Sequence, residues 1–311
     1  MNCTYFPYLR GKLNEMMVLR ELSEVIASST NVLPIIEPVK SNSNTRLSIA
    51  KFQEAGMPFL MLCNPFRGDF ARGLSIDDLI QQTELEEYDN WIPTFGVTDE
   101  TTVGALQIFL ERFESQPKAV AYLGHPSRQM VLDALDLEDR TIVHHVFIKD
   151  PMPGSFVNQI EPQRRVLISD PFEKQARNAD YPRNEFFSDK HTVEANPEAI
   201  DFGDFSIVGD HFSETGGPAY AITLHHIHNR EDQGALYVDH FISDDVDTPF
   251  DPSGKTIQAL GKLVDALRNT IPNDTNACSE YQSIYDSGNT RGLGYMKRLA
   301  IKHHLEVMLR L

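Results

Sequence analysis

The chain is 311 residues long, a length at which one large α/β domain buries a full hydrophobic core, so a disulfide-stapled mini-protein is excluded. It carries 28 Lys and Arg against 45 Asp and Glu, for a formal net charge of −17. Direct binding to duplex nucleic acid or to anionic lipid depends on clustered basic side chains, so this excess of acidic residues argues against both. The acidic surface is either simply solvated or a docking face for a basic partner.

The cysteines and the N-terminus indicate the compartment. Cys3, Cys63 and Cys278 are scattered and have no CxxC spacing, which favours neither a disulfide framework nor a thiolate zinc site. Residues 1–17 lack the apolar core of a signal peptide, and no stretch reaches the roughly 18 apolar residues of a membrane span. We therefore expect a cytoplasmic protein in a reducing environment.

Short apolar runs of strand length recur along the first two thirds of the chain. They cover residues 4–8, 34–38, 59–63, 91–95, 119–123, 142–148, 165–169 and 205–209. Near-continuous apolar runs of this length are typical of strands that are buried on both faces, as in parallel sheets.

Helical patterns separate these runs. Residues 13–27 and 103–113 place apolar side chains at i, i+3 and i+4 spacing, the mark of an amphipathic helix. Capping residues precede two further helices, at 47–55 and from residue 79 onward. The sixth helix, around residues 156–160, is short, and the seventh crossover, 171–199, is long and polar.

Alternating strands and helices predict parallel strands joined by right-handed crossovers. With eight such units, we expect a TIM-like (β/α)8 barrel of the α/β class. An open doubly wound sheet is the alternative, although no GxGxxG follows the first strand as its dinucleotide-binding version requires.

The pattern changes after the eighth run. Residues 219–228 and 235–243 are β-rich and flank a polar loop, which predicts an antiparallel hairpin inserted after strand 8. A helix at 256–267, a turn-rich tail at 270–290 and a final helix at 296–309 predict a C-terminal helical extension. We expect one domain over 1–311, with the barrel core at about 1–210, the hairpin at about 211–250 and the C-terminal helices at about 251–311.

The final helix is basic within an acidic chain. Its basic residues are Lys297, Arg298, Lys302, His303 and His304, followed by Arg310. This helix is a candidate surface for an acidic partner or for nucleic acid, and a solvated helix face is the alternative.

In a barrel, chemistry belongs to side chains just beyond the carboxyl ends of the strands, because the loops there converge on one mouth. We predict Lys149, Asp170, Asp210 and Glu37 as catalytic residues, since acids and bases from separate strands would face one another there. Predicted ligand-binding residues are Arg10, Lys12, Lys40, Asn64 and Glu214. Gly96, His125, Asp150 and Asp204 occupy similar positions. The competing interpretation is that ion pairs such as Lys149 with Asp170 only close the rim.

Two further segments are candidate binding sites. The glycine-rich residues 203–220 combine tight turns with acidic side chains, which suits an anion cradle or a divalent-ion loop, or simply a chain reversal. Histidines 225, 226, 228 and 240 in the hairpin resemble a two-strand metal site without a thiolate. We predict no metal there. GxSxG and HExxH are absent from the sequence, so hydrolases of those types lack support.

Five blocks of the sequence are family-typical. They are YFPYLRGKLNE, PIIEPVK, FGDFSIVGDHFSETGGPAYAITLHH, DHFISDDVDTPFDPSGK and RGLGYMKRLAIKHHLEVM. Together they resemble the beta-protein family of bacteria and phages over nearly the whole chain.

The resemblance implies a compact barrel-like protein encoded beside a small restriction-like nuclease protein, in gene neighbourhoods associated with phage defence. We therefore expect a component of a two-part anti-phage system that binds and controls a nuclease partner, with nucleic acid reached through that partner or the basic helix. The alternatives are a hydrolase or phosphodiesterase at the barrel mouth and an acidic surface that mimics DNA. No site of the family is carried over, so the mouth residues rest on their position alone.

Overall fold

The computed structural model describes residues 3–149, 152–198, 200–214, 217, 219–230 and 233–311. Within them the chain forms two compact units. The first comprises Met1–Asp170 and Asn196–Asp204, and the second comprises Pro171–Ala195 and Phe205–Leu311. The predicted barrel core at about 1–210 therefore includes a segment, Pro171–Ala195, that belongs to the second unit.

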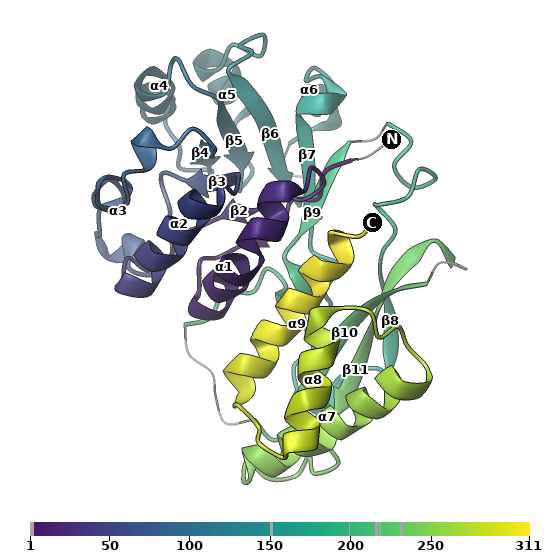
Figure 1. The fold of residues 1–311 in the computed structure, drawn as a ribbon. Helices are drawn as coiled ribbons and strands as arrows, with labels where there is room; N and C mark the ends of the chain where they lie inside the picture. The colour runs from purple at the N-terminus through teal and green to yellow at the C-terminus, as the bar shows by residue number, and fades with distance from the viewer. Residues whose placement is uncertain (1–2, 150–151, 199, 215–216, 218, 231–232) are drawn as a thin grey trace. The chain divides into compact units, whose positions relative to one another are not determined.

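The first unit is built on an eight-stranded parallel sheet whose strand order follows the chain (Figure 1). Its strands are β1 (Tyr8–Leu9), β2 (Ile35–Ile36), β3 (Phe59–Leu62), β4 (Trp91–Val97), β5 (Lys118–Tyr122), β6 (Ile142–Ile148), β7 (Arg165–Ser169) and β9 (Asp201–Asp204). The runs are apolar because side chains on both faces of such a sheet are covered.

The sheet curls until its two edges meet. Phe6 N donates to Phe202 O at 2.8 Å, and Phe202 N donates to Thr4 O at 3.2 Å. Tyr5 pairs with Val32 on one side and with Phe202 on the other. The predicted TIM-like barrel is therefore confirmed, with this seam joining its first and last strands.

Helices follow the strands around the barrel, as Figure 1 shows. They are α1 (Leu13–Ser28), α2 (Ser43–Ala55), α3 (Ile76–Gln82), α4 (Val103–Arg112), α5 (Arg128–Ala134) and α6 (Gly154–Val157). Side-chain caps begin four of them, at Asn42, Ser75, Thr102 and Ser127, because these oxygens accept from backbone N–H groups that the first turn leaves without partners.

The eighth strand was predicted four residues too late. Residues 205–209 form a tight 3-10 turn, Ser206–Val208, with φ values of +54° at Ser206 and +68° at Gly209. The eighth strand of the barrel is instead β9. The carboxylates of two β9 residues accept hydrogen bonds from residues that precede β1. Asp201 Oδ1 accepts from Thr4 N at 2.7 Å and Asp204 Oδ1 accepts from Tyr5 Oη at 2.7 Å.

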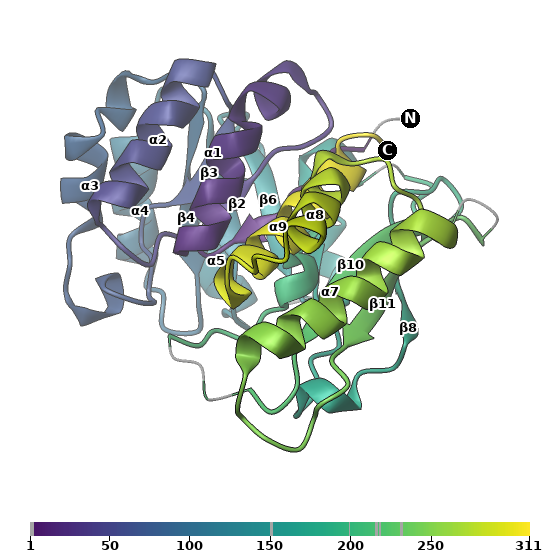
Figure 2. The same cartoon turned by 60° about the horizontal axis from the view of Figure 1, so that its bottom comes forward.

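The second unit is an antiparallel sheet covered on one face by helices (Figures 1 and 2). The sheet has the order β10 (Thr223–Arg230), β11 (Ala235–Ile242) and β8 (Asn184–Ser188). The helices α7 (Pro252–Asn269) and α9 (Leu293–Met308) pack on the strands, and α8 (Asn276–Ser287) packs on both helices. Their core includes Leu260, Leu263, Tyr281 and Leu299.

The predicted hairpin is confirmed as β10 and β11, but two elements were missed. Strand β8 comes from the polar seventh crossover, and α8 lies in the tail that we expected to be turn-rich. The side chains of Lys302, His303 and His304 on α9 are buried. These three residues therefore do not contribute to an exposed basic surface on the final helix, because their side chains bond within the second unit.

Among the residues that the structure describes, no helix is both long and apolar enough to cross a membrane.

Candidate functional site

The alternation of side chains along the barrel strands decides which residues face its interior. Phe6 precedes β1, and its ring contacts that of His144 on β6 at 5.1 Å. Because β1 and β6 are not neighbours in the sheet, this contact crosses the inside of the barrel. Tyr8 and Arg10, two and four residues further along, therefore share the interior face.

The neighbouring strands continue this interior layer. Tyr8 pairs with Ile35, so Glu37, two residues after Ile35, points inward at the level of Arg10. The register through β3 and β4 places Leu62 and Thr94 at this level, so Asn64 and Gly96, two residues further along, face inward one level closer to the mouth. The carboxyl ends of four strands thus contribute inward-facing residues at two successive levels of the barrel mouth.

Glu37 is the centre of this layer. Its side chain is fully buried, and its Oε2 accepts from Arg67 Nη1 at 2.8 Å and from Tyr8 Oη at 3.1 Å. Arg10 Nε, also buried, lies 3.8 Å from the same oxygen. Within the described residues, Glu37 Oε1 has no hydrogen-bond partner. Buried polar atoms are almost always bonded, so Oε1 is the atom of this cluster most open to a ligand.

Burial and the arginines act on Glu37 in opposite directions. Burial raises the pKa of the Glu37 carboxyl, and this effect outweighs the lowering by Arg67 and Arg10. Burial and the neighbouring Glu37 charge also raise the pKa of Tyr8 well above its usual value. The cluster therefore holds two guanidinium groups around a carboxyl that takes up a proton more readily than usual.

The other predicted binding residues at the mouth have structural partners. Lys12 caps α1, since its backbone N donates to Glu15 Oε2 at 3.1 Å. Lys40 Nζ donates to Asp69 Oδ1 at 2.9 Å on the partly exposed rim. Asn64 bonds through both ends of its amide to the backbone of Gly96.

Lys149 and Asp170 lie where we expected them. They follow the paired strands β6 and β7, and both are exposed. Lys149 adopts a left-handed backbone conformation with φ +58°, which is uncommon outside glycine and asparagine. His125 is exposed beyond β5, and Asp150 lies outside the described residues.

The remaining predicted residues lie away from the barrel interior or in the other unit. Asp204 shares the face of Phe202, whose ring contacts Tyr5 on the outside of the barrel at 5.6 Å. Asp210 and Glu214 belong to the second unit. In the glycine-rich segment, Gly203 lies against Phe6 O at the seam, where a Cβ atom would not fit. This glycine therefore allows the first and last strands to approach closely.

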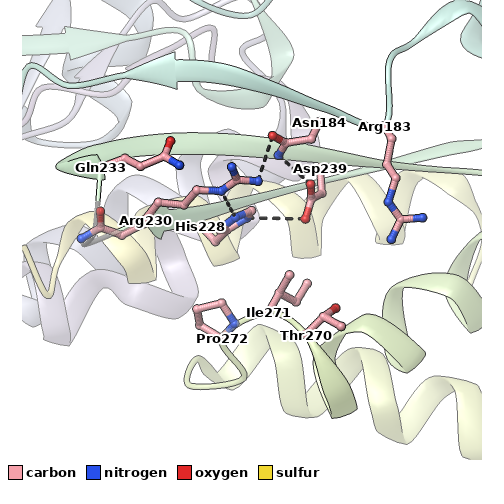
Figure 3. Close-up of a pocket in the computed structure, with 10 residues that line it drawn as sticks. Arg183, Asn184, His228, Arg230, Gln233, Asp239, Thr270, Ile271 and Pro272 are labelled. Carbon is pink, nitrogen blue, oxygen red and sulfur yellow. Dashed lines mark hydrogen bonds and ion pairs between the residues drawn. The ribbon is translucent and has the colours of Figure 1, made fainter.

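A second candidate site is a pocket of about 810 Å³ within the second unit (Figure 3). Side chains from β8, β10 and β11 form one wall, and residues 270–272 after α7 form the other. Four of these side chains make a closed ring. Its members are Asn184, His228, Arg230 and Asp239.

The ring fixes the tautomer of His228. Arg230 Nε donates to His228 Nε2 at 3.3 Å, so the imidazole proton lies on Nδ1, which is 3.6 Å from Asp239 Oδ2. Arg230 also donates to Asn184 Oδ1 at 2.9 Å, and Asn184 Nδ2 donates to Asp239 Oδ1 at 2.6 Å. Burial, ahead of the charges, lowers the pKa of His228, so the pocket presents a neutral imidazole between an arginine and a carboxylate.

Sequence reasoning missed four residues of these sites, which are Tyr8, Arg67, Arg230 and Asn184. Tyr8 was not nominated because the sequence places it within a strand, and only residues beyond the strand ends were considered. Its inward-facing side chain is long enough to reach Glu37 at the mouth. Arg67 lies in the loop after β3, several residues past the strand end. His228 was recognised as a strand histidine, but its partners Arg230 and Asn184 depend on the hairpin register and on the missed strand β8.

The sequence matches no protein-family model, and it matches no curated protein. Among solved structures, the chain is similar to the Bacillus cereus spore cortex-lytic enzyme SleL, with 10% sequence identity and a TM-score of 0.34. The alignment covers 97% of this chain and 74% of that chain. A similarity at this level identifies neither a family nor an activity.

Proposed function

We propose that the chain is the non-nuclease component of a two-part anti-phage system, acting in the cytoplasm, and that the mouth of its barrel binds a small anionic ligand. The resemblance of five sequence blocks to the beta-protein family supports the defence context. The cluster around Glu37 supports the ligand site, and it is the observation that carries the proposal.

The chemistry of the cluster favours a ligand with an anionic group and a hydroxyl. Arg10, Arg67 and Glu37 together carry an excess of positive charge within a chain whose formal net charge is −17. Guanidinium groups bind phosphate and carboxylate with paired hydrogen bonds. The buried Oε1 of Glu37, which has no hydrogen-bond partner within the described residues, would accept a hydrogen bond from a hydroxyl or amino group of the ligand. A nucleotide has both kinds of group, and binding it would control the nuclease partner.

Two measurements test this proposal. Co-expression with the nuclease-like product of the neighbouring gene should give a complex on co-purification and should protect cells in plaque assays. Arg67→Gln should abolish protection while complex formation persists. Arg140→Gln is the matched control, because Arg140 makes only an exposed ion pair with Glu161 among the described residues. A chain that neither binds the partner nor protects cells would overturn the proposal.

A hydrolase or phosphodiesterase at the same mouth is the second candidate. The raised pKa of Glu37 favours it, because a carboxyl that holds a proton closer to neutral pH suits general acid–base catalysis. Turnover of a phosphodiester substrate should then be lost in each of the variants Glu37→Gln, Lys149→Ala and Asp170→Ala. The melting temperature should stay unchanged in the two variants at exposed positions, Lys149→Ala and Asp170→Ala. Full biological activity in all three variants would remove this candidate.

A further inference from the structure

Three buried side chains from three elements meet in the second unit. They are His226 on β10, Cys278 on α8 and His303 on α9. Each supplies one potential ligand atom, and these atoms all lie within 4.8 Å of one another. The cluster belongs to neither the barrel mouth nor the residues that line the pocket of Figure 3.

His226 is the most unusual member of the cluster. Its side chain is fully buried, and neither Nδ1 nor Nε2 has a hydrogen-bond partner within the described part of the chain. Its ring stacks on that of His303, with centroids 3.8 Å apart and an interplanar angle of 15°. Because buried polar atoms nearly always have partners, two unsatisfied nitrogens on one buried ring indicate a ligand that binds there.

His303 is oriented as metal-binding histidines usually are. Its Nε2 lies 2.6 Å from Ile227 O and donates to it, since a carbonyl oxygen only accepts. The lone pair is therefore on Nδ1, which lies 2.8 Å from Thr275 Oγ1 and 3.7 Å from Cys278 Sγ. A ligating imidazole typically fixes its tautomer by such a hydrogen bond to a backbone carbonyl.

We propose that His226, Cys278 and His303 form a binding site for a Zn²⁺ ion. One thiolate and two imidazoles are a donor set that zinc prefers, and they leave one position of a tetrahedron for water. Binding releases the thiol proton of Cys278 to solvent, and the ion takes the thiolate as a ligand without any change of oxidation state. The ion would join β10, α8 and α9, which are far apart in the sequence.

Binding requires two rearrangements. The Thr275 hydroxyl, which lies 2.8 Å from His303 Nδ1 and 3.1 Å from Cys278 Sγ, gives up these two contacts to the ion. The stacked rings define the other. Imidazole lone pairs lie in the plane of the ring, so two parallel rings cannot both direct a lone pair at one ion. The His226 ring therefore turns about its side-chain bonds when zinc binds. This turn breaks no hydrogen bond, because neither nitrogen of His226 has one among the described residues.

The test uses the full chain after treatment with a chelator. Titration with Zn²⁺ should show one ion bound per chain and a rise in melting temperature, because a ligand that binds only the folded state stabilises it. Replacement of zinc by Co²⁺ should give the absorption bands of a tetrahedral site with a thiolate ligand.

Two ligand variants and one control complete the experiment. Cys278→Ala and His226→Phe should each weaken zinc binding by at least about 100-fold, since even the loss of a group that only holds a metal ligand in place costs about 10- to 100-fold. Phe keeps a flat buried ring at position 226, so that variant should fold, as circular dichroism in chelator will check. Cys63→Ala removes a thiol of the first unit and should bind zinc like the unchanged chain. Absence of zinc binding, or equal binding by all the variants, would overturn the proposal.

Discussion

The side chain of Asn64 bonds to both backbone groups of Gly96. Asn64 Oδ1 accepts from Gly96 N at 2.7 Å, and Asn64 Nδ2 donates to Gly96 O at 2.8 Å. The backbone ladder between β3 and β4 ends with Cys63 N donating to Thr94 O. The amide of Asn64 thus continues the ladder past the end of β3. Asn64 was predicted to bind a ligand because of its position at the barrel mouth. In the structure its side chain holds β3 and β4 together.

Replacing Asn64 with alanine should destabilise the barrel. Asn64→Ala leaves the buried N–H and C=O of Gly96 without these partners, and an unsatisfied buried group costs about 1–3 kcal/mol. The free energy of unfolding, measured with urea, should fall by that amount. Asn90→Ala loses one exposed hydrogen bond to Gly56 O and should change it by less than about 0.5 kcal/mol. Equal effects of the two substitutions would contradict the structural role of Asn64.

A methyl group at Gly203 should disturb the seam of the barrel. A Cβ there would lie 1.9 Å from Phe6 O and 2.6 Å from Ile168 Cδ1, so the first and last strands would have to separate. Overpacking of this kind costs about 1–3 kcal/mol, and Gly203→Ala should lower the melting temperature accordingly. Gly104→Ala is the control, because nothing lies within 4 Å of its Cβ in α4 and alanine favours a helix by up to about 1 kcal/mol. A Gly203→Ala variant as stable as the Gly104→Ala variant would exclude tight closure.

Seven barrel strands could be predicted because their signal is local. Parallel strands that are covered on both faces produce apolar runs whatever their neighbours are. Strand β9 gives no such run. Two of its four residues, Asp201 and Asp204, are charged. Their place in a barrel strand is explained by hydrogen bonds to Thr4 and Tyr5, almost two hundred residues earlier in the chain. Helix α8 did carry a local signal, since buried Cys278, Tyr281 and Ile284 have helical spacing behind the Thr275 cap.

The sites were less predictable than the fold because their residues meet through register and packing. Glu37 could be nominated since it directly follows a strand, but its partner Arg67 lies in a loop whose path the sequence does not show. The zinc proposal depends on His226, Cys278 and His303, which come from one predicted strand, one missed helix and one helix that was interpreted as a basic surface. No short motif joins them.

Stability should fall in mild acid because of buried histidines. Burial, with a smaller effect of Arg164, lowers the pKa of His144 to about 4 and that of His145 to about 3, and burial lowers the pKa of His240 to about 4. The unfolded chain binds these protons near pH 6.5. The stability from the neutral rings is therefore complete above about pH 6.5 and is lost as the pH falls toward 4, by up to about 1.4 kcal/mol per histidine per pH unit.

Melting temperatures between pH 8 and pH 4 check this expectation. His145→Gln should reduce the slope below pH 6.5, because one buried titrating ring is removed. His125, which is exposed, supplies the control substitution. A melting temperature that is constant between pH 7 and pH 5 would contradict the burial of these rings.

The last prediction concerns the balance between Glu37 and its arginines. Two guanidinium groups adjoin Glu37, yet its pKa is raised, so burial disfavours its charge more than Arg67 and Arg10 favour it. Glu37→Gln should consequently cost little at pH 7, whereas Arg67→Met leaves a buried carboxylate with only the Tyr8 hydroxyl and the more distant Arg10 among the partners described for it. Removing one member of a buried pair costs about 3–5 kcal/mol, and the partial exposure of Arg67 reduces this to about 2–3 kcal/mol.

A double-mutant cycle separates the two contributions. Arg67→Met should cost about 2–3 kcal/mol in the unchanged chain and less than about 1 kcal/mol in the Glu37→Gln background, because the charge that needs Arg67 is then absent. The cost should also shrink as the pH falls into the raised titration range of Glu37, since a protonated carboxyl needs no cation. Urea unfolding at pH 7 and pH 5 measures both effects. Equal costs of Arg67→Met in the two backgrounds would show that Arg67 stabilises the barrel through packing alone. The charge of Arg67 would then no longer support the proposal that the barrel mouth binds an anionic ligand.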